Sequence, residues 1–370
     1  MLAIDISASF YPMTLGGGLL AFVFIAISSV GALTTKIFKI NGNRFEICLK
    51  HTQCDEHLLS LLVYISAVGC VVMLIPFVQE IQNYDDIAAY FYFSRVAELK
   101  GEPLVVVSWL YAQFPPLGFV TSLFVFVERF KQKKITINVV FTVLLVALTS
   151  ISLSISGTRS VLIIYLLLLL VIYLGGRNIP FWKTIVVGFI FITVFALSSY
   201  FMRASEADKA SMSLFEILAK NISIYIFGGI KGFDVFQAQH QIIYHEVFST
   251  LFDSGEASVM SFFNLGFSIE SNVYSFFAVY VHYFGWFIGA ILVYFIFFAV
   301  GLIYEIRFLN VFCFLLSKFA LTATVLTVFH DYFFSLFPYI FRTLIIYLIL
   351  YKIRPIRLLL RGRKICTRLN

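Results

Sequence analysis

The chain has 370 residues, of which 61% are hydrophobic, 44 are Phe and only 13% carry a charge, and its mean hydropathy is +0.94. A water-soluble protein of this length could not cover so much apolar surface, which excludes an ordinary globular enzyme. The net charge of +7 comes mainly from clusters that flank apolar runs and from the tail, so it indicates contact with anionic lipid rather than with nucleic acid.

Apolar runs follow one another along the chain, each close to the length that a helix needs to cross the hydrocarbon core of a bilayer. They lie near residues 15–36, 58–79, 104–127, 135–155, 160–176, 184–200, 274–304, 309–329 and 338–352. The pattern predicts an all-α fold, a polytopic transmembrane helix bundle of about 9–11 spans. Residues 1–370 are expected to form a single integral membrane domain.

The run 274–304 is too long for one simple crossing. A helix of about 31 residues reaches roughly 46 Å, against a hydrocarbon core of roughly 30 Å. Gly285 and Gly289 lie inside the run. We therefore expect Tyr274–Tyr283 to form a helix at the outer interface, with the crossing beginning near Gly285. Residues Leu214–Phe227 alternate apolar and polar side chains at helical spacing, which predicts an amphipathic helix on the membrane surface.

Lys and Arg are distributed unevenly between the two sides of this arrangement. Two thirds of the 27 follow the first, third, fifth and seventh runs or lie in the tail, 352–370. Because positive charge collects on the cytoplasmic side, the tail is predicted inside and the N-terminus outside, in the periplasm. The segment 199–273 then becomes one large periplasmic loop. Residues 1–14 contain no Lys or Arg, so a secretory signal is not expected and the first run is retained.

Two clusters of potential metal ligands fit known metal motifs poorly. The Cys-x-x-His-x-x-Cys-x-x-His segment 48–57 would turn its first and last ligands to opposite sides of a helix. His245 follows His240 at a spacing of five, with Glu246 next to it, unlike the zinc-protease motif. No metal or cofactor is therefore expected. Both clusters are interpreted as polar loop residues, with Glu246 or His245 as a proton acceptor as the alternative for the second.

The sharpest local signal is the segment Ser156–Ser160 (Ser-Gly-Thr-Arg-Ser), a tight link between two apolar runs on the outer side. Its glycine permits a turn, and the planar fork of Arg159 suits two oxygens of a phosphate or carboxylate. The alternative is an anchor that reaches lipid headgroups. Arg203, just past the sixth run, is a second outward cation or an ordinary flanking residue. Arg342 is an ionisable group inside a run, where it needs a cavity or a partner.

With these features the chain resembles the bacterial O-antigen polymerases, the oligosaccharide repeat-unit polymerase family. The likeness rests on the Arg-containing turn at 156–160 and on the outside loop with Gly-Gly-Ile-Lys-Gly-Phe at 228–233. It also rests on Asn-Val-Tyr-Ser at 272–275, followed by the Tyr-Phe-Gly segment that enters a late span. The resemblance is architectural over nearly the whole chain. One departure is His282, because the family often has an acidic residue near the Phe-Gly pair.

The resemblance implies a multi-pass glycosyltransferase of the bacterial inner membrane. A growing glycan on undecaprenyl diphosphate would pass to a new lipid-linked repeat unit at the periplasmic face. The diphosphate is a good leaving group, so the enzyme mainly stabilises its charge and positions the acceptor. Expected partners are the undecaprenyl-diphosphate-linked oligosaccharide, the lipid bilayer and a chain-length regulator protein, with no nucleic acid. The candidate catalytic residues are Arg159, Arg203 and Glu246. The candidate substrate-binding residues are His245, Asn272, Tyr274, His282 and Arg342.

Two other function classes stay open. An O-antigen ligase-like glycosyltransferase shares the chemistry of the polymerase. A lipid-linked oligosaccharide flippase or other transporter is also polytopic and rich in aromatic residues. Transporters usually carry internal repeats or paired broken helices, and the sequence shows no such symmetry, while the single large outside loop favours an enzyme.

Overall fold

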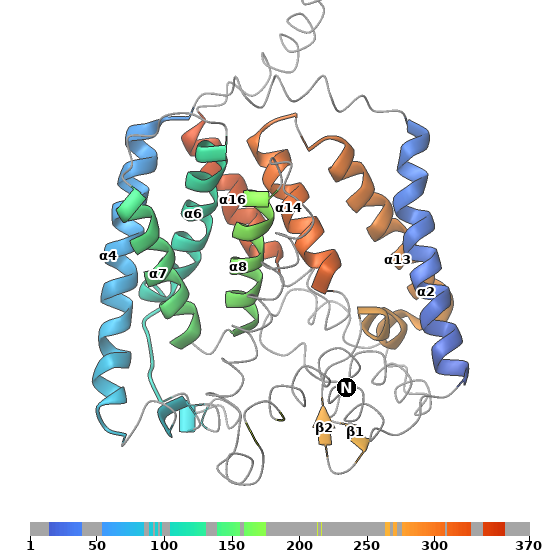
Figure 1. The fold of residues 1–370 in the computed structure, drawn as a ribbon, viewed down its shortest axis with the longest axis horizontal. Coiled ribbons are helices and arrows are strands. Elements are labelled where there is room, and N and C mark those ends of the chain that lie inside the picture. Colours follow the sequence, from blue (N-terminus) through green and yellow to red (C-terminus); the bar gives the residue numbers. More distant parts are fainter. Residues whose placement is uncertain are drawn as a thin grey trace, which may run out of the picture. The chain divides into compact units, whose positions relative to one another are not determined.

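The computed structural model describes most of the apolar runs (Figure 1). The described residues are 15–38, 54–84, 89–91, 93–94, 97, 104–130, 139–155, 159–174, 213, 216, 263–266, 269–271, 276–307, 309–326 and 336–351. Most of the helices in these ranges are predominantly apolar, and two of them, Glu56–Ile81 and Phe284–Glu305, are long and apolar enough to cross a membrane. The run 184–200, the tail 352–370 and most of the loop 199–273 lie outside the described residues.

The predicted runs correspond to helices over most of the residues that the structure describes, with residues 104–110 as the main exception. In chain order these are α2 (Leu15–Thr34), η1 (Thr35–Phe38), α4 (Glu56–Ile81), η2 (Tyr111–Gln113), α6 (Phe114–Phe130), α7 (Val139–Ile155), α8 (Arg159–Leu174), α13 (Phe276–Glu305), α14 (Val311–Leu326) and α16 (Phe337–Leu350). The chain divides into two compact units. Unit one holds α2, η1, α13 and the end of α14 from Ala320. Unit two holds α4, η2, α6, α7, α8, the first part of α14 and α16.

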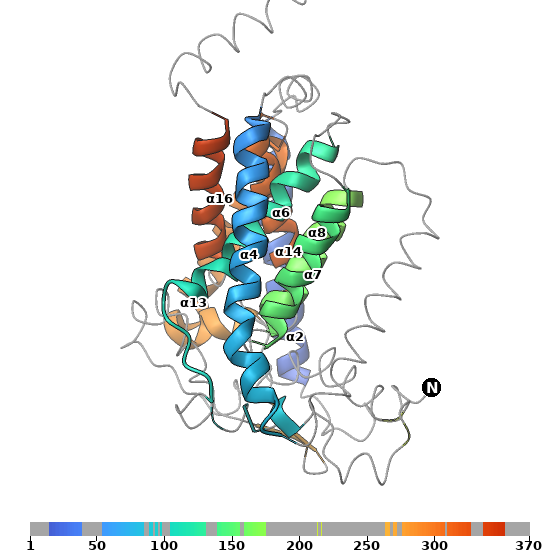
Figure 2. The ribbon, with the colours of Figure 1, turned by 90° about the vertical axis from the view of Figure 1, so that its left-hand side faces the viewer.

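Helix α6 contacts α4, α7 and α8 in unit two, and its residues Phe119–Val125 are all fully buried. The amide of Asp55, just before α4, donates to the carbonyl of Leu350 at the end of α16 over 3.0 Å. These two helices are therefore antiparallel, as Figure 2 also shows. The hydroxyl of Tyr351 donates to the carboxyl group of Glu128 near the end of α6, so α6 and α16 end at the same level.

Two further contacts give the directions of α7 and α8. Arg129, near the end of α6, donates to the hydroxyl of Thr142 near the start of α7 over 3.0 Å, so α6 and α7 are antiparallel. Helix α8 follows α7 after a three-residue link and packs against it, as antiparallel neighbours do. Helices α6, α8 and α16 thus begin at one end of unit two, which we call the outer end after the charge pattern. The alternation agrees with the directions predicted for these runs.

The start of α6 differs from the sequence prediction. The predicted span 104–127 begins as helix only at η2 and Phe114, and residues 104–110 are not helical. Pro115 and Pro116 lie in the first turn of α6, where a missing amide hydrogen costs nothing and the fixed φ of proline favours a helix start. Apolar composition alone does not reveal this boundary.

The outward faces of unit two are apolar as well. On α4, Leu61, Val68, Val71, Ile75 and Val78 are between 47% and 62% exposed. Helices α7 and α16 show the same feature through Val139, Val140, Val143, Phe341, Leu348 and Ile349. In water such continuous faces would be unfavourable by about 25 cal/mol for each Å², whereas hydrocarbon solvates them without cost. A bilayer is the solvent that suits these helices.

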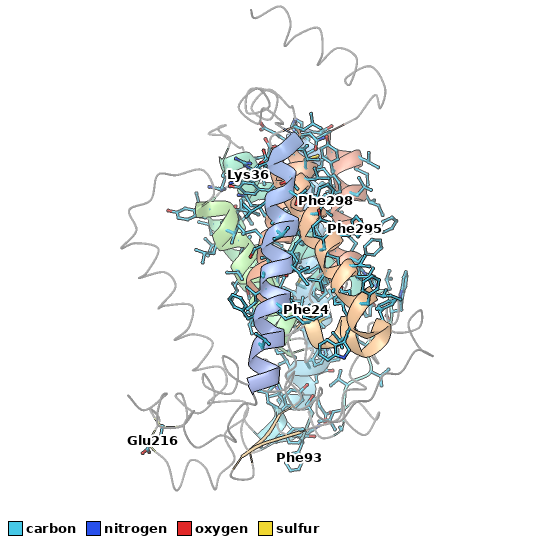
Figure 3. The ribbon with its side chains drawn as sticks, turned by 90° about the vertical axis from the view of Figure 1, so that its right-hand side faces the viewer. Phe24, Lys36, Phe93, Glu216, Phe295 and Phe298 are labelled. Carbon is cyan, nitrogen blue, oxygen red and sulfur yellow. The ribbon has the colours of Figure 1, made fainter. Side chains whose placement is uncertain are left out.

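Unit one is organised by the close approach of α2 and α13, the most extensive helix pair in the described chain. A Cβ added at Gly31 would lie 2.5 Å from the carbonyl oxygen of Tyr294. Further along, Thr35 packs against Gly301 in the same way. Such small residues let two backbones approach closely in a membrane. Figure 3 shows α2 alongside α13, with Lys36 near one end of this pair and Phe24 farther along it.

Helix α13 breaks at Gly285, as the run length predicted. Gly285 has φ 73° and ψ 175°, a conformation that is essentially restricted to glycine. The short segment before the break lies across the long segment after it (Figure 1). A Cβ at Gly289 would lie 3.1 Å from the Tyr280 carbonyl oxygen, so the two segments touch. Phe24 of α2 packs on both sides of the break, against Phe277 and Trp286, with ring centroids 5.3 and 6.1 Å away.

Of the large loop, two single residues and two short strands are described. Strands β1 (Phe263–Gly266) and β2 (Ile269–Ser271) form an antiparallel hairpin with an irregular register between Asn264 and Gly266. Over the residues that the structure describes, the fold is thus helical with one short hairpin that the sequence did not predict. Ser213 and Glu216 form a capping box, in which the Ser213 amide and hydroxyl donate to the carboxylate and lower the pKa of Glu216. Glu216 is helical, and the rest of the amphipathic helix predicted for Leu214–Phe227 lies outside the described residues.

Candidate functional site: an arginine at the outer end of unit two

Arg342 lies in the second turn of α16 and is half-buried. Its Nη2 donates to Oε1 of Gln113 over 2.8 Å, and its guanidinium carbon lies 5.9 Å from the ring centre of Tyr339. Nε2 of Gln113 donates to the Trp109 carbonyl over 3.3 Å. The second bond orients the Gln113 amide so that its oxygen faces Arg342. The cation is thus held in place by a neutral acceptor and an aromatic ring.

The Arg342 guanidinium group still has N–H groups with which it can bind a ligand. Among the described side chains no carboxylate pairs with Arg342, and only one of its five N–H groups is used by Gln113. A charged group inside an apolar helix is costly, and such residues usually mark a functional path or site. A planar fork that presents two parallel N–H groups suits the oxygens of a phosphate group.

The start of α8, where Arg159 stands, lies at a similar depth. The Phe119 ring of α6 packs against the Tyr165 ring of α8, with ring centres 4.9 Å apart. Gln113 precedes Phe119 by six residues and Arg159 precedes Tyr165 by six residues. Both helices run in the same direction, so Gln113 and the backbone of Arg159 each stand about 9 Å nearer the outer end than the paired rings.

The Phe119 ring contacts two tyrosine rings and so connects three helices at this end of unit two. Phe119 also packs against Tyr339 of α16, with ring centres 4.5 Å apart. The same ring therefore sets the positions of α8 and α16 relative to α6. The Tyr165 hydroxyl donates to the Ser122 hydroxyl over 2.8 Å, and this hydroxyl donates to the Phe119 carbonyl. A rigid centre of this kind keeps the helix starts, and with them the arginines, at fixed positions.

Of the other predicted site residues, the structure describes the backbone of two and does not describe the remaining five. Arg159 is the first residue of α8, and His282 lies in the short segment of α13; the side chains of both lie outside the described residues. Arg203, His245, Glu246, Asn272 and Tyr274 lie outside the described residues altogether. Within the described residues, no group of three or more His, Cys, Asp and Glu could hold a metal ion.

Sequence reasoning missed Gln113 and Tyr339. Gln113 is the one amide side chain between Trp109 and Pro115. Its position, just before a proline pair, was a usable signal for a polar residue at the start of a span. Its pairing with a side chain 229 residues later could not be deduced from one sequence.

Comparison with known proteins adds no further assignment. No family model, no curated protein and no solved structure matches this chain. The function therefore has to be inferred from the arrangement of the residues themselves and from the motif resemblance described above.

At the inner end of unit two, a second polar group closes the helix ends. The Glu128 side chain is 3% exposed and accepts the hydrogen bond from Tyr351. Next to it, Arg129 bonds Thr142. These contacts join the end of α6 to the end of α16 and to the start of α7. We therefore assign Glu128 and Arg129 a role in helix packing and not in the reaction.

Proposed function

We propose that this chain is a multi-pass glycosyltransferase of the bacterial inner membrane, an O-antigen or surface polysaccharide polymerase. It transfers a growing glycan from undecaprenyl diphosphate to a new lipid-linked repeat unit at the periplasmic face. The observation that carries the proposal is Arg342, a half-buried cation held by Gln113 at the depth where α8 begins with Arg159. Two arginines at one level of an apolar bundle suit a diphosphate that is anchored in lipid.

In this proposal the arginines neutralise the charge that develops on the leaving diphosphate. The bond between the anomeric carbon of the growing glycan and the diphosphate oxygen breaks, and a hydroxyl oxygen of the acceptor sugar bonds to the carbon in its place. The hydroxyl proton goes to a base, for which Glu246 or His245 is the candidate. Donors placed in advance around a developing charge commonly contribute about 10²–10³-fold to the rate for each donor. Arg203, His282, Asn272 and Tyr274 stay candidates for positioning the substrate in the loop.

The membrane placement follows from the apolar faces and from the charge pattern. We infer that unit two lies in the bilayer with its outer end toward the periplasm, that 199–273 is a periplasmic loop and that the tail is cytoplasmic. A chain-length regulator protein is the expected partner. A ligase-like transferase would use the same arginines, while a flippase would need no group that stabilises a leaving diphosphate.

Cells that lack the gene test the proposal. Their surface polysaccharide should show a single repeat unit on its lipid and no longer bands, because the unit is still made, exported and attached. Loss of the one-unit band as well would favour a flippase or a ligase. Complementation by the wild-type gene should restore the ladder, and Arg342→Ala should lower chain growth about 10²–10³-fold.

The substitution Gln113→Glu distinguishes two roles of Arg342: binding of the substrate diphosphate, and anchoring of the helix only. The new carboxylate would occupy the place of the amide oxygen, 2.8 Å from Nη2 of Arg342, and would pair with the charge that the diphosphate needs. Chain growth should fall although the fold gains an ion pair. Gln82→Glu is the matched control, because Gln82 is exposed at the end of α4. Normal ladders with Gln113→Glu would remove Arg342 from the substrate site.

A further inference from the structure

We propose that the segment 104–111, just before α6, is an anchor in the headgroup region of the bilayer. The phospholipids at the outer end of unit two surround its exposed side chains. The proposal rests on the placement of unit two in a bilayer and is independent of the transfer reaction.

The segment 104–111 has one packed side and one exposed side. On the packed side, Leu104, Val105 and Val107 lie against an apolar cluster that also contacts Ile155 at the end of α7; its buried members are Met73, Phe77 and Tyr90. On the exposed side, four large apolar side chains are between 42% and 85% exposed: Val106, Trp109, Leu110 and Tyr111. The segment is therefore fixed to the outer end of unit two and presents an apolar surface.

The backbone of this segment needs hydrogen-bond partners from its surroundings. Between the residues that the structure describes, residues 104–107 make no backbone–backbone hydrogen bond. Farther along, a tight turn uses the carbonyls of Ser108 and Leu110, which accept from the amides of Ala112 and Gln113 over 3.1 and 3.2 Å. Irregular backbone does not face lipid inside the hydrocarbon core, because no group there can bond its polar atoms. This requirement places 104–107 outside the hydrocarbon core.

The exposed side chains exclude bulk water as the preferred surroundings, since four large apolar groups side by side are unfavourable there. The headgroup region satisfies both requirements: water and headgroups bond the backbone, and the nearby acyl chains cover the side chains. Tryptophan and tyrosine are enriched at this level of membranes. The apolar face of α4 also continues to this level, because Ile75 and Val78 are about half exposed on either side of Phe77, which belongs to the packed cluster.

The anchor also fixes the depth of Arg342. Trp109 accepts the hydrogen bond from Nε2 of Gln113 through its carbonyl, and Oε1 of the same amide accepts from Arg342. A tryptophan held among the headgroups therefore keeps the guanidinium group close to their level.

Fluorescence quenching by brominated phospholipids in proteoliposomes measures the depth of Trp109. The chain has three tryptophans, so Trp182→Phe combined with Trp286→Phe leaves Trp109 as the one emitter. We expect bromines close to the headgroup to quench it more strongly than bromines near the end of the acyl chain. The matched control is Val68→Trp in protein whose three native tryptophans are replaced by phenylalanine. Val68 is 62% exposed in the middle of α4 and should give the opposite order.

The outcomes distinguish this proposal from the placement of unit two. Quenching of Trp109 by aqueous iodide but by neither lipid would place the segment in water. Protection from every quencher would mean that a protein surface covers it, and stronger quenching by the deep bromines would place it in the hydrocarbon core. Each of these results overturns the anchor. A control that the deep bromines fail to quench would overturn the placement of unit two in a bilayer.

Thiol labelling in proteoliposomes gives a second test that keeps the native tryptophans. Val106→Cys should react with a membrane-impermeant maleimide at least about tenfold more slowly than Gln82→Cys, because only the thiolate reacts and apolar surroundings disfavour it. Both positions are exposed at the outer end, Gln82 directly after α4. The wild-type protein gives the background from the native cysteines. Equal rates at the two positions would overturn the proposal.

Discussion

The substitution Gly31→Ala tests the packing of unit one, because close packing predicts that it lowers the free energy of unfolding instead of raising it. In an exposed helix, alanine is more favourable than glycine by about 1 kcal/mol. At position 31 the added methyl group would lie 2.5 Å from the carbonyl oxygen of Tyr294 and 3.3 Å from the amide nitrogen of Phe298. Both are backbone atoms that a rotamer change cannot move. Overpacking of this kind costs about 1–3 kcal/mol, so we expect the net effect to be destabilising.

Unfolding by SDS in mixed micelles measures this effect. Trp286 packs against Phe24 of α2, so tryptophan fluorescence reports on the separation of α2 from α13. Ser29→Ala is the matched control, because Ser29 is exposed on the same helix and its hydroxyl bonds only the Ile25 carbonyl one turn earlier. We expect the control to unfold like the wild-type protein and Gly31→Ala to unfold at a lower SDS fraction. Equal or greater stability of Gly31→Ala would refute the close contact between α2 and α13.

Three other predictions concern the break, the inner end and the topology. Gly285→Ala should destabilise α13 by about 1–3 kcal/mol in the same unfolding assay, because alanine disfavours φ 73°; an unchanged midpoint would argue for a continuous helix. Tyr351→Phe should destabilise unit two by about 1–3 kcal/mol, since it removes the hydrogen bond that the Tyr351 hydroxyl donates to the buried Glu128 carboxyl group; equal stability would contradict a structural role for this bond. Reporter fusions after Ile81, Gln132, Ile230 and Arg363 should give outside, inside, outside and inside, and a cytoplasmic signal at Ile230 would overturn the topology.

Apolar runs and glycine placement predicted much of the fold. The positions of α2, α4, α7, α8, α14 and α16 followed from hydropathy, because the period and length of apolar helices are local properties. The break at Gly285 followed from comparing the run length with the thickness of the bilayer. The late start of α6 was missed because hydropathy does not distinguish an apolar segment without helical structure, such as 104–110, from a helix. The hairpin at β1 and β2 was missed because its short strands carry no clear alternation.

The candidate site was predictable only in part. Arg342 was recognisable from the sequence as a charge within an apolar run, since such a charge needs a partner. The identity of that partner depends on α6 and α16 lying side by side, which one sequence does not reveal. Arg159 was placed at a turn, and the structure puts it at the first residue of α8. Its role at the diphosphate stays a prediction.

The most direct test of the proposed function is chain growth by the purified protein. Protein reconstituted into liposomes with an undecaprenyl-diphosphate-linked repeat unit should convert the single unit into a ladder of longer glycans on the lipid and release free undecaprenyl diphosphate, one molecule for each bond formed. Gln82→Glu should give the same ladder, and Gln113→Glu should give a much weaker one. A folded wild-type protein that leaves the single unit unchanged, or moves it across the bilayer without joining units, would contradict the assignment as a polymerase.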